Sequence, residues 1–98
     1  MDIKKIANAN AVTLELAGRL DTTTAPQLEA ELKDCMDAAD ELTLDLANLE
    51  YISSAGLRVL LAAQKVMGKK KGMKLHNVCA EIMEVFEITG FSDILTIE

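Results

Sequence analysis

The sequence predicts a single α/β domain with a mostly parallel or mixed sheet. Short stretches in which apolar and polar residues alternate, typical of strands, are separated by stretches in which apolar residues recur every three or four positions, typical of helices. The chain has 98 residues, one domain's length, and 50% of them are hydrophobic, enough for a core without disulfides. No linker, internal repeat or low-complexity segment divides residues 1–98.

The first twenty residues predict two strands. Between Val12 and Leu16 apolar side chains alternate with polar or small ones, the pattern of a half-buried strand. Ile3 and Ile6 indicate a short strand before it, with residues 7–10 as the turn. We expect Gly18 to end this unit.

The next segment predicts an amphipathic helix. Thr22, Thr23 and Thr24 are candidate N-caps, and Pro26 suits the first turn of a helix. Apolar residues then recur at three- and four-residue steps as far as Ala39, so the helix should have about fifteen residues.

Leu42–Leu46 alternates again and predicts a strand, with residues 49–52 as the connection that follows. Ser53 then opens a second helix, which should run to about Lys70. Residues 73–78 predict a third clear strand.

The C-terminal residues predict a third helix around residues 82–86, ended by Gly90. Residues 94–97 fit a terminal strand or a short helix equally well.

The second helix has an apolar arc wider than contact with a sheet requires. On a helical wheel Arg58 and Lys65 share one narrow sector, and Val59 and Val66 lie beyond one edge of the core-facing sector. Either neighbouring helices cover this excess, or Val59, Ala62 and Val66 belong to a partner-binding surface with a basic rim.

Charge and composition exclude several classes of protein. The net charge is −6, and a run of three lysines, residues 69–71, is the only basic cluster, so we expect no nucleic-acid binding. Cys35 and Cys79 lack the spacing of a metal site and should be reduced core thiols. No apolar stretch is long enough to enter a membrane, so we expect a soluble, cytoplasmic monomer that needs no cofactor or metal.

Two serines, Ser53 and Ser54, stand at the start of the second helix. Serine at this position caps unpaired backbone N–H groups far more often than it is modified. A phosphate would nonetheless be tolerated there, because helix N-termini favour anions. Such a site could change the charge of a surface without changing the core.

Three stretches resemble the STAS family, named after sulfate transporters and anti-sigma-factor antagonists. They are Leu16-Ala-Gly-Arg-Leu-Asp21, Leu44-Asp-Leu-Ala-Asn-Leu49 and Tyr51-Ile-Ser-Ser-Ala-Gly-Leu57, and the resemblance covers essentially the whole chain. It implies a sheet of four to five strands with three to four helices packed mainly on one face. Aligning Gly56 and Leu57 places Ser54 on the serine that is phosphorylated in the family.

The resemblance also implies a mechanism, that of an anti-sigma factor antagonist. The unphosphorylated antagonist binds an anti-sigma factor that is also a serine kinase of the GHKL type, and binding releases a sigma factor. Phosphorylation at Ser54 separates the complex, and a PP2C-type serine phosphatase resets it. The antagonist itself is no enzyme. The implied partner-binding residues are Asp21, Thr22, Thr23, Ser53, Ser54, Ala55, Gly56, Leu57, Arg58, Val59 and Ala62.

The motif departs from the family at two positions. The family has Asp before the phosphorylated serine and Ser or Thr after it, whereas this chain has Ser53 and Ala55. Two alternatives therefore stand: Ser53 is the modified residue, or the chain is an accessory STAS subunit that docks on the ATPase of a lipid-transporting ABC system. An enzyme is disfavoured, because the one histidine, His76, lies in a strand pattern and no G-x-S-x-G elbow surrounds the serines.

Overall fold

The computed structural model describes all 98 residues and contains a five-stranded mixed sheet. The elements in chain order are β1 (Asp2–Asn8), β2 (Ala11–Leu20), α1 (Ala25–Met36), β3 (Glu41–Ile52), α2 (Ser54–Met67), β4 (Gly72–His76), α3 (Ala80–Thr89), the 3₁₀ turn η1 (Phe91–Asp93) and β5 (Thr96–Ile97). The strands lie in the order β1-β2-β3-β4-β5; β1 is antiparallel to β2 and the other pairs are parallel. The predicted fold class is confirmed.

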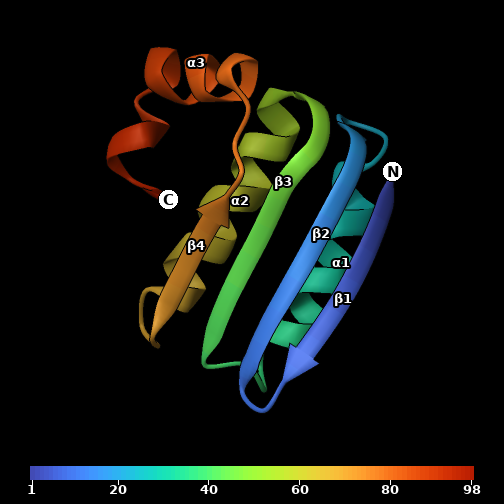
Figure 1. Ribbon diagram of the computed structural model, residues 1–98, viewed down its shortest axis with the longest axis vertical. Coiled ribbons are helices and arrows are strands. Elements are labelled where there is room, and N and C mark those ends of the chain that lie inside the picture. The colour runs from blue at the N-terminus through green and yellow to red at the C-terminus, as the bar shows by residue number, and fades with distance from the viewer.

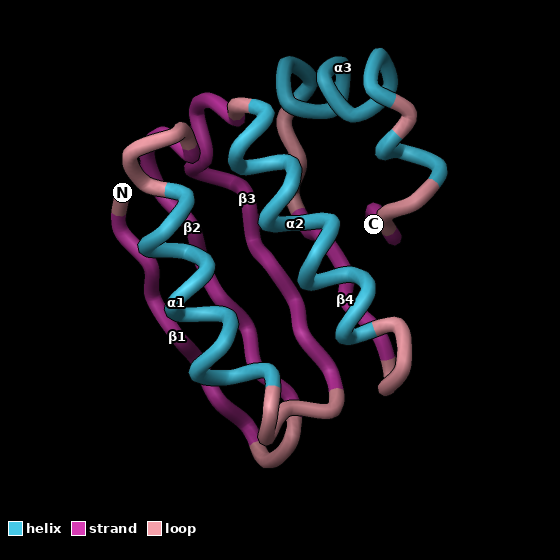
Figure 2. The backbone as a smooth tube through the Cα atoms, turned by 180° about the vertical axis from the view of Figure 1, so that it is seen from behind, coloured by secondary structure: helices cyan, strands magenta, loops and turns pink.

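Two helices cover one face of the sheet. Figure 1 shows the sheet in front of α1 and α2, and Figure 2 shows the same two helices from behind, side by side and running along the strands. Both follow a parallel strand, α1 after β2 and α2 after β3, so both begin at the same edge of the sheet. In both views α3 lies beyond this edge, where β3 and β4 end.

The core between sheet and helices is entirely apolar. A cluster of 24 buried residues contains no polar or charged side chain. Leu14, Leu44 and Leu75, from the three central strands, are completely buried, as is Phe86 of α3. Truncating such a leucine to alanine typically costs about 2–5 kcal/mol, so these residues account for a large part of the stability.

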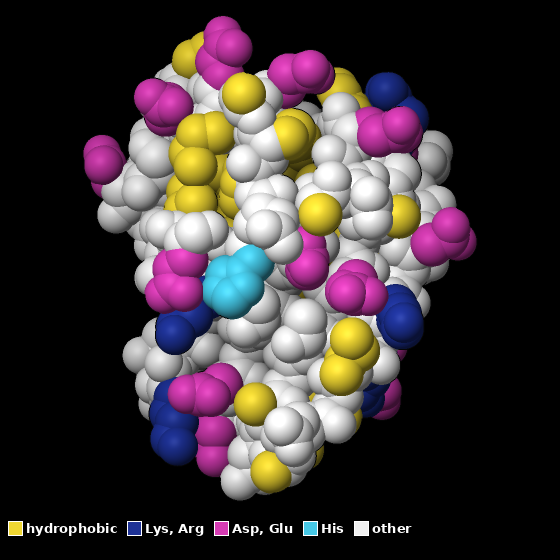
Figure 3. Space-filling model, viewed as in Figure 1, with side chains coloured by type: hydrophobic (Ala, Val, Ile, Leu, Met, Phe, Trp, Pro, Cys, Tyr) yellow, Lys and Arg dark blue, Asp and Glu magenta, His cyan; other side chains and the backbone are white.

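The other face of the sheet is uncovered. Its side chains include Thr13, Glu15, Thr43 and Asp45, all partly exposed. Figure 3 shows this face with acidic and basic side chains intermingled around His76, and with apolar side chains gathered toward α3. The alternation of apolar and polar residues in β2 and β3 thus separates a core face from a solvent face.

Strand β3 is longer than the sequence predicts. Residues 49–52, predicted as a connection, continue the strand to Ile52. The pairing of β2 with β3 shifts register twice, and each shift leaves one extra residue on β3. The buried side chains there are Leu46, Leu49 and Ile52, three residues apart rather than two, because each β-bulge interrupts the alternation.

Other boundaries differ by a few residues. Strand β2 continues past Gly18 to Leu20, and α1 stops at Met36 instead of reaching Ala39. The end of α3 is as predicted, because Gly90 has a φ of 81°, the left-handed conformation that glycine adopts easily. For residues 94–97 the sequence allows a strand or a short helix, and the structure has the strand β5 at Thr96–Ile97, with the helical turn η1 just before the segment.

Candidate functional site

The two serines occupy different positions at the start of α2. Ser53 is the N-cap: its backbone is extended, its N–H donates to the carbonyl of Leu20 at 2.9 Å, and its Oγ accepts from the N–H of Gly56 at 3.4 Å. Ser54 is the first residue of the helix, and its side chain is exposed. The capping function therefore falls to Ser53, and the hydroxyl of Ser54 is available to another protein.

Three of the predicted partner-binding residues are buried: Gly56, Leu57 and Val59. A Cβ on Gly56 would lie 2.6 Å from Cγ of Leu20 and 3.0 Å from Cγ1 of Ile52, so glycine lets α2 approach the ends of β2 and β3 closely. Gly56 and Leu57 fix the position of the serines and are not themselves exposed to a partner, whereas Val59 lines the groove described below.

The loop before α1 is organised by Asp21. Its Oδ1 accepts from the Thr23 N–H at 2.9 Å, the Thr23 hydroxyl at 2.7 Å and the Thr24 N–H at 3.2 Å. The hydrogen bond from the Thr23 side chain is the main reason that the pKa of Asp21 is lowered. The threonines, predicted as caps, thus act together with the aspartate: Thr24 is the N-cap residue, but the carboxylate accepts the loop N–H groups.

Sequence reasoning did not single out Arg19 and Tyr51 as a pair. The Arg19 guanidinium lies 4.2 Å from the centre of the Tyr51 ring, and its Nε is 3.8 Å from Oδ2 of Asp21. The two residues are register partners in β2 and β3, and both are exposed. Only the bulged register brings them together, so no pattern within a single strand could have indicated the contact.

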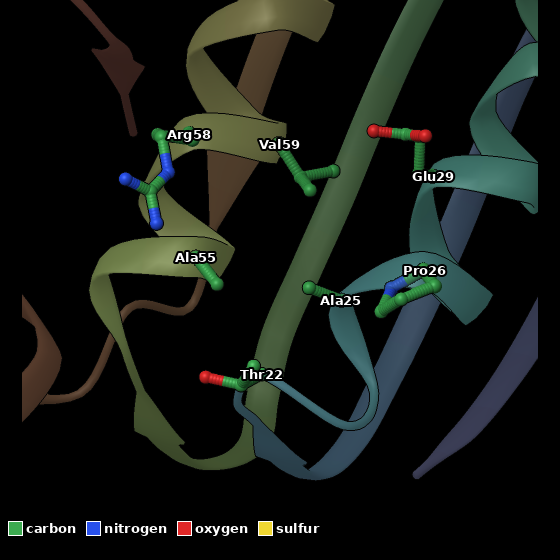
Figure 4. Close-up of a pocket in the computed structure, with 7 residues that line it drawn as sticks. All are labelled: Thr22, Ala25, Pro26, Glu29, Ala55, Arg58 and Val59. Atoms are coloured by element: carbon green, nitrogen blue, oxygen red, sulfur yellow. The ribbon is translucent and has the colours of Figure 1, made fainter.

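A shallow groove separates the starts of α1 and α2. It has a volume of about 330 Å³ and is lined by Thr22, Ala25, Pro26, Glu29, Ala55, Arg58 and Val59. Figure 4 shows Ala55 and Val59 of α2 pointing across the gap toward Ala25 of α1, with Arg58 on the outer side of α2. The structure therefore brings together the predicted Thr22, Ala55, Arg58 and Val59, and adds residues of α1 that sequence reasoning missed.

The wide apolar arc of α2 is partly buried and partly exposed. Val59 is 8% exposed, because neighbouring elements cover it, whereas Val66 is 43% exposed and Ala62 is exposed as well. Neighbouring helices cover part of the excess, and the rest stays on the surface.

The polar groups of the protein show no catalytic arrangement around the serines. His76 lies at the end of β4 and its Nε2 is 3.2 Å from Oε1 of Glu98; it makes no hydrogen bond to either serine. No group of three or more His, Cys, Asp or Glu side chains could hold a metal ion. What the site presents is an exposed hydroxyl at the positive end of a helix.

One lysine of the run 69–71 has a structural function. Lys70 Nζ donates to backbone carbonyls at and after the end of α1, those of Met36, Asp37 (3.1 Å) and Ala39 (2.9 Å). A cation at a helix C-terminus is favourable. Cys35 and Cys79 are both free, and burial raises the pKa of Cys35, as expected for a thiol in the core.

Comparisons with known proteins agree on one family. A family model described as "Mlab, STAS domain" matches residues 4–96. The chain is 32% identical over 98 residues to the anti-sigma-B factor antagonist of Bacillus subtilis, and the match covers 99% of this chain and 88% of that protein. It is 42% identical over 84 residues to a protein of Bordetella bronchiseptica named "Putative anti-sigma factor antagonist BtrV", covering 84% of this chain and 72% of the relative.

Solved structures share the fold. The crystal structure of an anti-sigma factor antagonist from Mycobacterium paratuberculosis matches with a TM-score of 0.89 at 23% identity, covering 98% of this chain and 83% of the other. The unphosphorylated form of the anti-sigma factor antagonist SpoIIAA matches with a TM-score of 0.83 at 18% identity, covering 99% and 88%. The phosphorylated form of SpoIIAA, from Bacillus, gives a TM-score of 0.76 over 99% and 91% of the two chains. No helix of this protein combines the length and apolar character that a membrane crossing requires.

Proposed function

Since the chain belongs to the STAS domain family, we propose that it is an anti-sigma factor antagonist that works by partner switching at Ser54. In its unphosphorylated form it binds an anti-sigma factor that is also a GHKL-type serine kinase, and a sigma factor is released. Phosphorylation of Ser54 ends the binding, and a PP2C-type serine phosphatase restores it. The protein acts through its surface and is not an enzyme.

The observation that carries the proposal is the position of Ser54. It is the first residue of α2 and exposed, while the neighbouring Ser53 supplies the cap. A phosphate of about −1.5 to −2 charges on this hydroxyl would meet the positive end of the helix, so the fold would tolerate it. The same charge would lie beside the groove between α1 and α2, where a partner would have to desolvate it.

Two relatives support this proposal. The Bacillus subtilis protein is named as an anti-sigma-B factor antagonist and aligns with almost the whole chain. SpoIIAA, whose fold this chain shares, is an anti-sigma factor antagonist with a structure in its phosphorylated form.

The test is a pull-down from native cell extract with wild type, Ser54→Ala and Ser54→Asp, read by mass spectrometry. We expect an anti-sigma factor kinase with wild type and Ser54→Ala but not with Ser54→Asp. Ser92→Asp is the matched control, because Ser92 is the only other serine outside the pair, and it should retain the kinase.

The alternatives give different outcomes. If Ser53 is the modified residue, phosphopeptide mapping will locate the phosphate there, and Ser53→Ala rather than Ser54→Ala will abolish labelling. Recovery of an ABC ATPase irrespective of the substitution at position 54 would replace the partner switch with a transporter subunit.

A further inference from the structure

The groove beside Ser54 continues along the helices. A second hollow of about 180 Å³ adjoins the first, and the two share Glu29 and Val59. Together the two hollows are lined by one stripe of residues on each helix, spaced three or four positions apart. The stripes are Ala55, Val59, Ala62 and Val66 on α2, and Ala25, Glu29, Leu32 and Met36 on α1. From the first to the last residue of each stripe the helix advances by eleven positions, about 16 Å, so the groove is three turns long.

The far half of this groove is apolar and open. Six of the eight residues that line the second hollow are hydrophobic. Ala62 and Val66 remain exposed although α1 lies alongside, and no other element of the chain covers them. Only a second molecule would remove Ala62 and Val66 from water.

The charge along the groove is unusual for this protein. The chain has a net charge of −6, yet α2 carries no acidic residue; its charged side chains are Arg58 and Lys65, seven positions apart on one side of the helix. On α1 the acidic lining residue, Glu29, is paired with Lys33 at 3.6 Å. The α2 rim is therefore positive in a protein that is otherwise acidic.

We propose that this groove binds an acidic amphipathic helix of the partner protein. An apolar face of three turns would enter the groove between Ala62 and Met36, and carboxylates flanking that face would meet Arg58 and Lys65. The identification of this partner with the anti-sigma factor rests on the function proposed above. A phosphate on Ser54, next to the lining residue Ala55, would then repel the acidic helix from one end of the groove and separate the complex without a change of fold.

The first test uses two synthetic helical peptides of about fifteen residues with the same leucine face, flanked in one by glutamates and in the other by lysines. Each is titrated into the ¹⁵N-labelled full chain and followed by NMR. We expect the acidic peptide to shift amide signals of α1 and α2 along the groove and the basic peptide to leave them unchanged. Equal binding of both, shifts elsewhere, or no shifts at millimolar peptide would overturn the proposal. So would groove shifts that depend on protein concentration alone, which would assign the groove to a second copy.

The second test uses surface variants that should not disturb folding. Lys65→Glu and Val66→Glu should each lower the affinity for the acidic peptide roughly five-fold or more. Lys4→Glu, on exposed β1, makes the same charge change away from the groove and should have no effect. Ile88→Glu places an acidic residue on α3, at a position where the side chain is 77% exposed, and should likewise leave peptide binding unchanged. If the groove variants and the control variants lose the same amount of affinity for the acidic peptide, the effect comes from net charge alone and a groove site is refuted.

Ser54→Asp separates this proposal from the proposed function. This variant should lower the affinity for the acidic peptide about as much as Lys65→Glu does. If the peptide responds to Ser54→Asp but the pull-down shows no kinase, the groove stands and the partner is a different protein. If the kinase is lost with Ser54→Asp while the peptide binds wild type and the variant equally, the switch stands and the groove is not its partner site.

Discussion

Two helices begin beside each other at the same edge of the sheet, and they are held there by different means. The start of α1 is fixed by polar groups. The Asp21 carboxylate accepts from the N–H groups of Thr23 and Thr24 and from the Thr23 hydroxyl, while Thr24 Oγ1 accepts from the Asp21 N–H and donates to the Arg19 carbonyl. The start of α2 has one side-chain cap, the 3.4 Å bond to Ser53, and close packing of Gly56 against Leu20.

The difference is the reason that the proposed switch is assigned to the start of α2 and not to that of α1. At α1 the Asp21 carboxylate already accepts the loop N–H groups, and its negative charge would repel an added phosphate. At α2 the stabilising contacts are below the surface, so the exposed Ser54 can change charge without breaking them. The folding contacts and the proposed regulatory group are thus separated by one or two residues.

The largest expected effect comes from the packing that holds α2. Gly56→Ala puts a methyl group 2.6 Å from a Leu20 carbon, so the helix must move or Leu20 must change rotamer. Overpacking of this kind typically costs about 1–3 kcal/mol, measured as the free energy of unfolding in urea. Ala62→Ser, on the exposed side of the same helix, is the control and should change it little. An unchanged stability for Gly56→Ala would show that close approach does not hold this helix.

The polar start of α1 should respond to pH, which the packed start of α2 should not. The lowered pKa of Asp21 means that the folded state holds its charged form more strongly than the unfolded chain does. The stability that the Asp21 charge contributes is fully present at pH values above 3.8, the ordinary pKa of the group. It is lost as the pH falls through the lower pKa that Asp21 has in the folded protein.

The measurement is the urea midpoint of wild type and Asp21→Asn from neutral pH down to about pH 2. Asparagine keeps the shape but cannot ionise, so the variant should be less stable at neutral pH and the two curves should converge in acid. Parallel curves over the whole range would show that the carboxylate charge does not stabilise this loop.

The sequence predicts most of these elements but not how the two helix starts differ. Alternation marks β2 and the first half of β3, and Pro26 and Gly90 mark helix ends, because these signals depend only on neighbouring residues. The prediction of a loop at Leu49 and Ile52 is wrong because two bulges change the spacing of buried residues, and bulges arise from pairing with β2.

The candidate site is predictable to a similar extent. The motif locates Ser54, but the groove beside it requires α1 and α2 to pack side by side, and so do the contributions of Ala25 and Glu29. Likewise, the threonines before α1 suggest a cap, while the carboxylate of Asp21, which accepts the N–H groups, becomes evident only from the folded loop. Contacts between elements that are distant in sequence leave no periodic signal within either one.

A smaller effect is expected from the one side-chain cap of α2. Ser53→Ala removes the acceptor for the Gly56 N–H, and loss of a serine cap costs about 0.5–2 kcal/mol; at 3.4 Å we expect a value near the lower end, measured in the same urea titration. Ser53→Asp keeps an acceptor and should retain the stability of wild type. A loss for Ser53→Ala greater than that for Gly56→Ala would show that capping holds this helix start more strongly than packing does.

The smallest effect is the one on which the proposed switch depends. Ser54→Asp places a carboxylate at the first position of α2, where interaction with the helix dipole is worth about 0.3–1 kcal/mol, so the variant should be at least as stable as wild type. Ser54→Asn, of the same shape without the charge, should lack this gain, and thermal unfolding of the three proteins at low salt gives the comparison. If Ser54→Asp is as stable as expected, its failure to bind a partner cannot be ascribed to unfolding. If it is clearly destabilised, the start of α2 does not tolerate negative charge, and a phosphate at Ser54 would act by disrupting the helix itself.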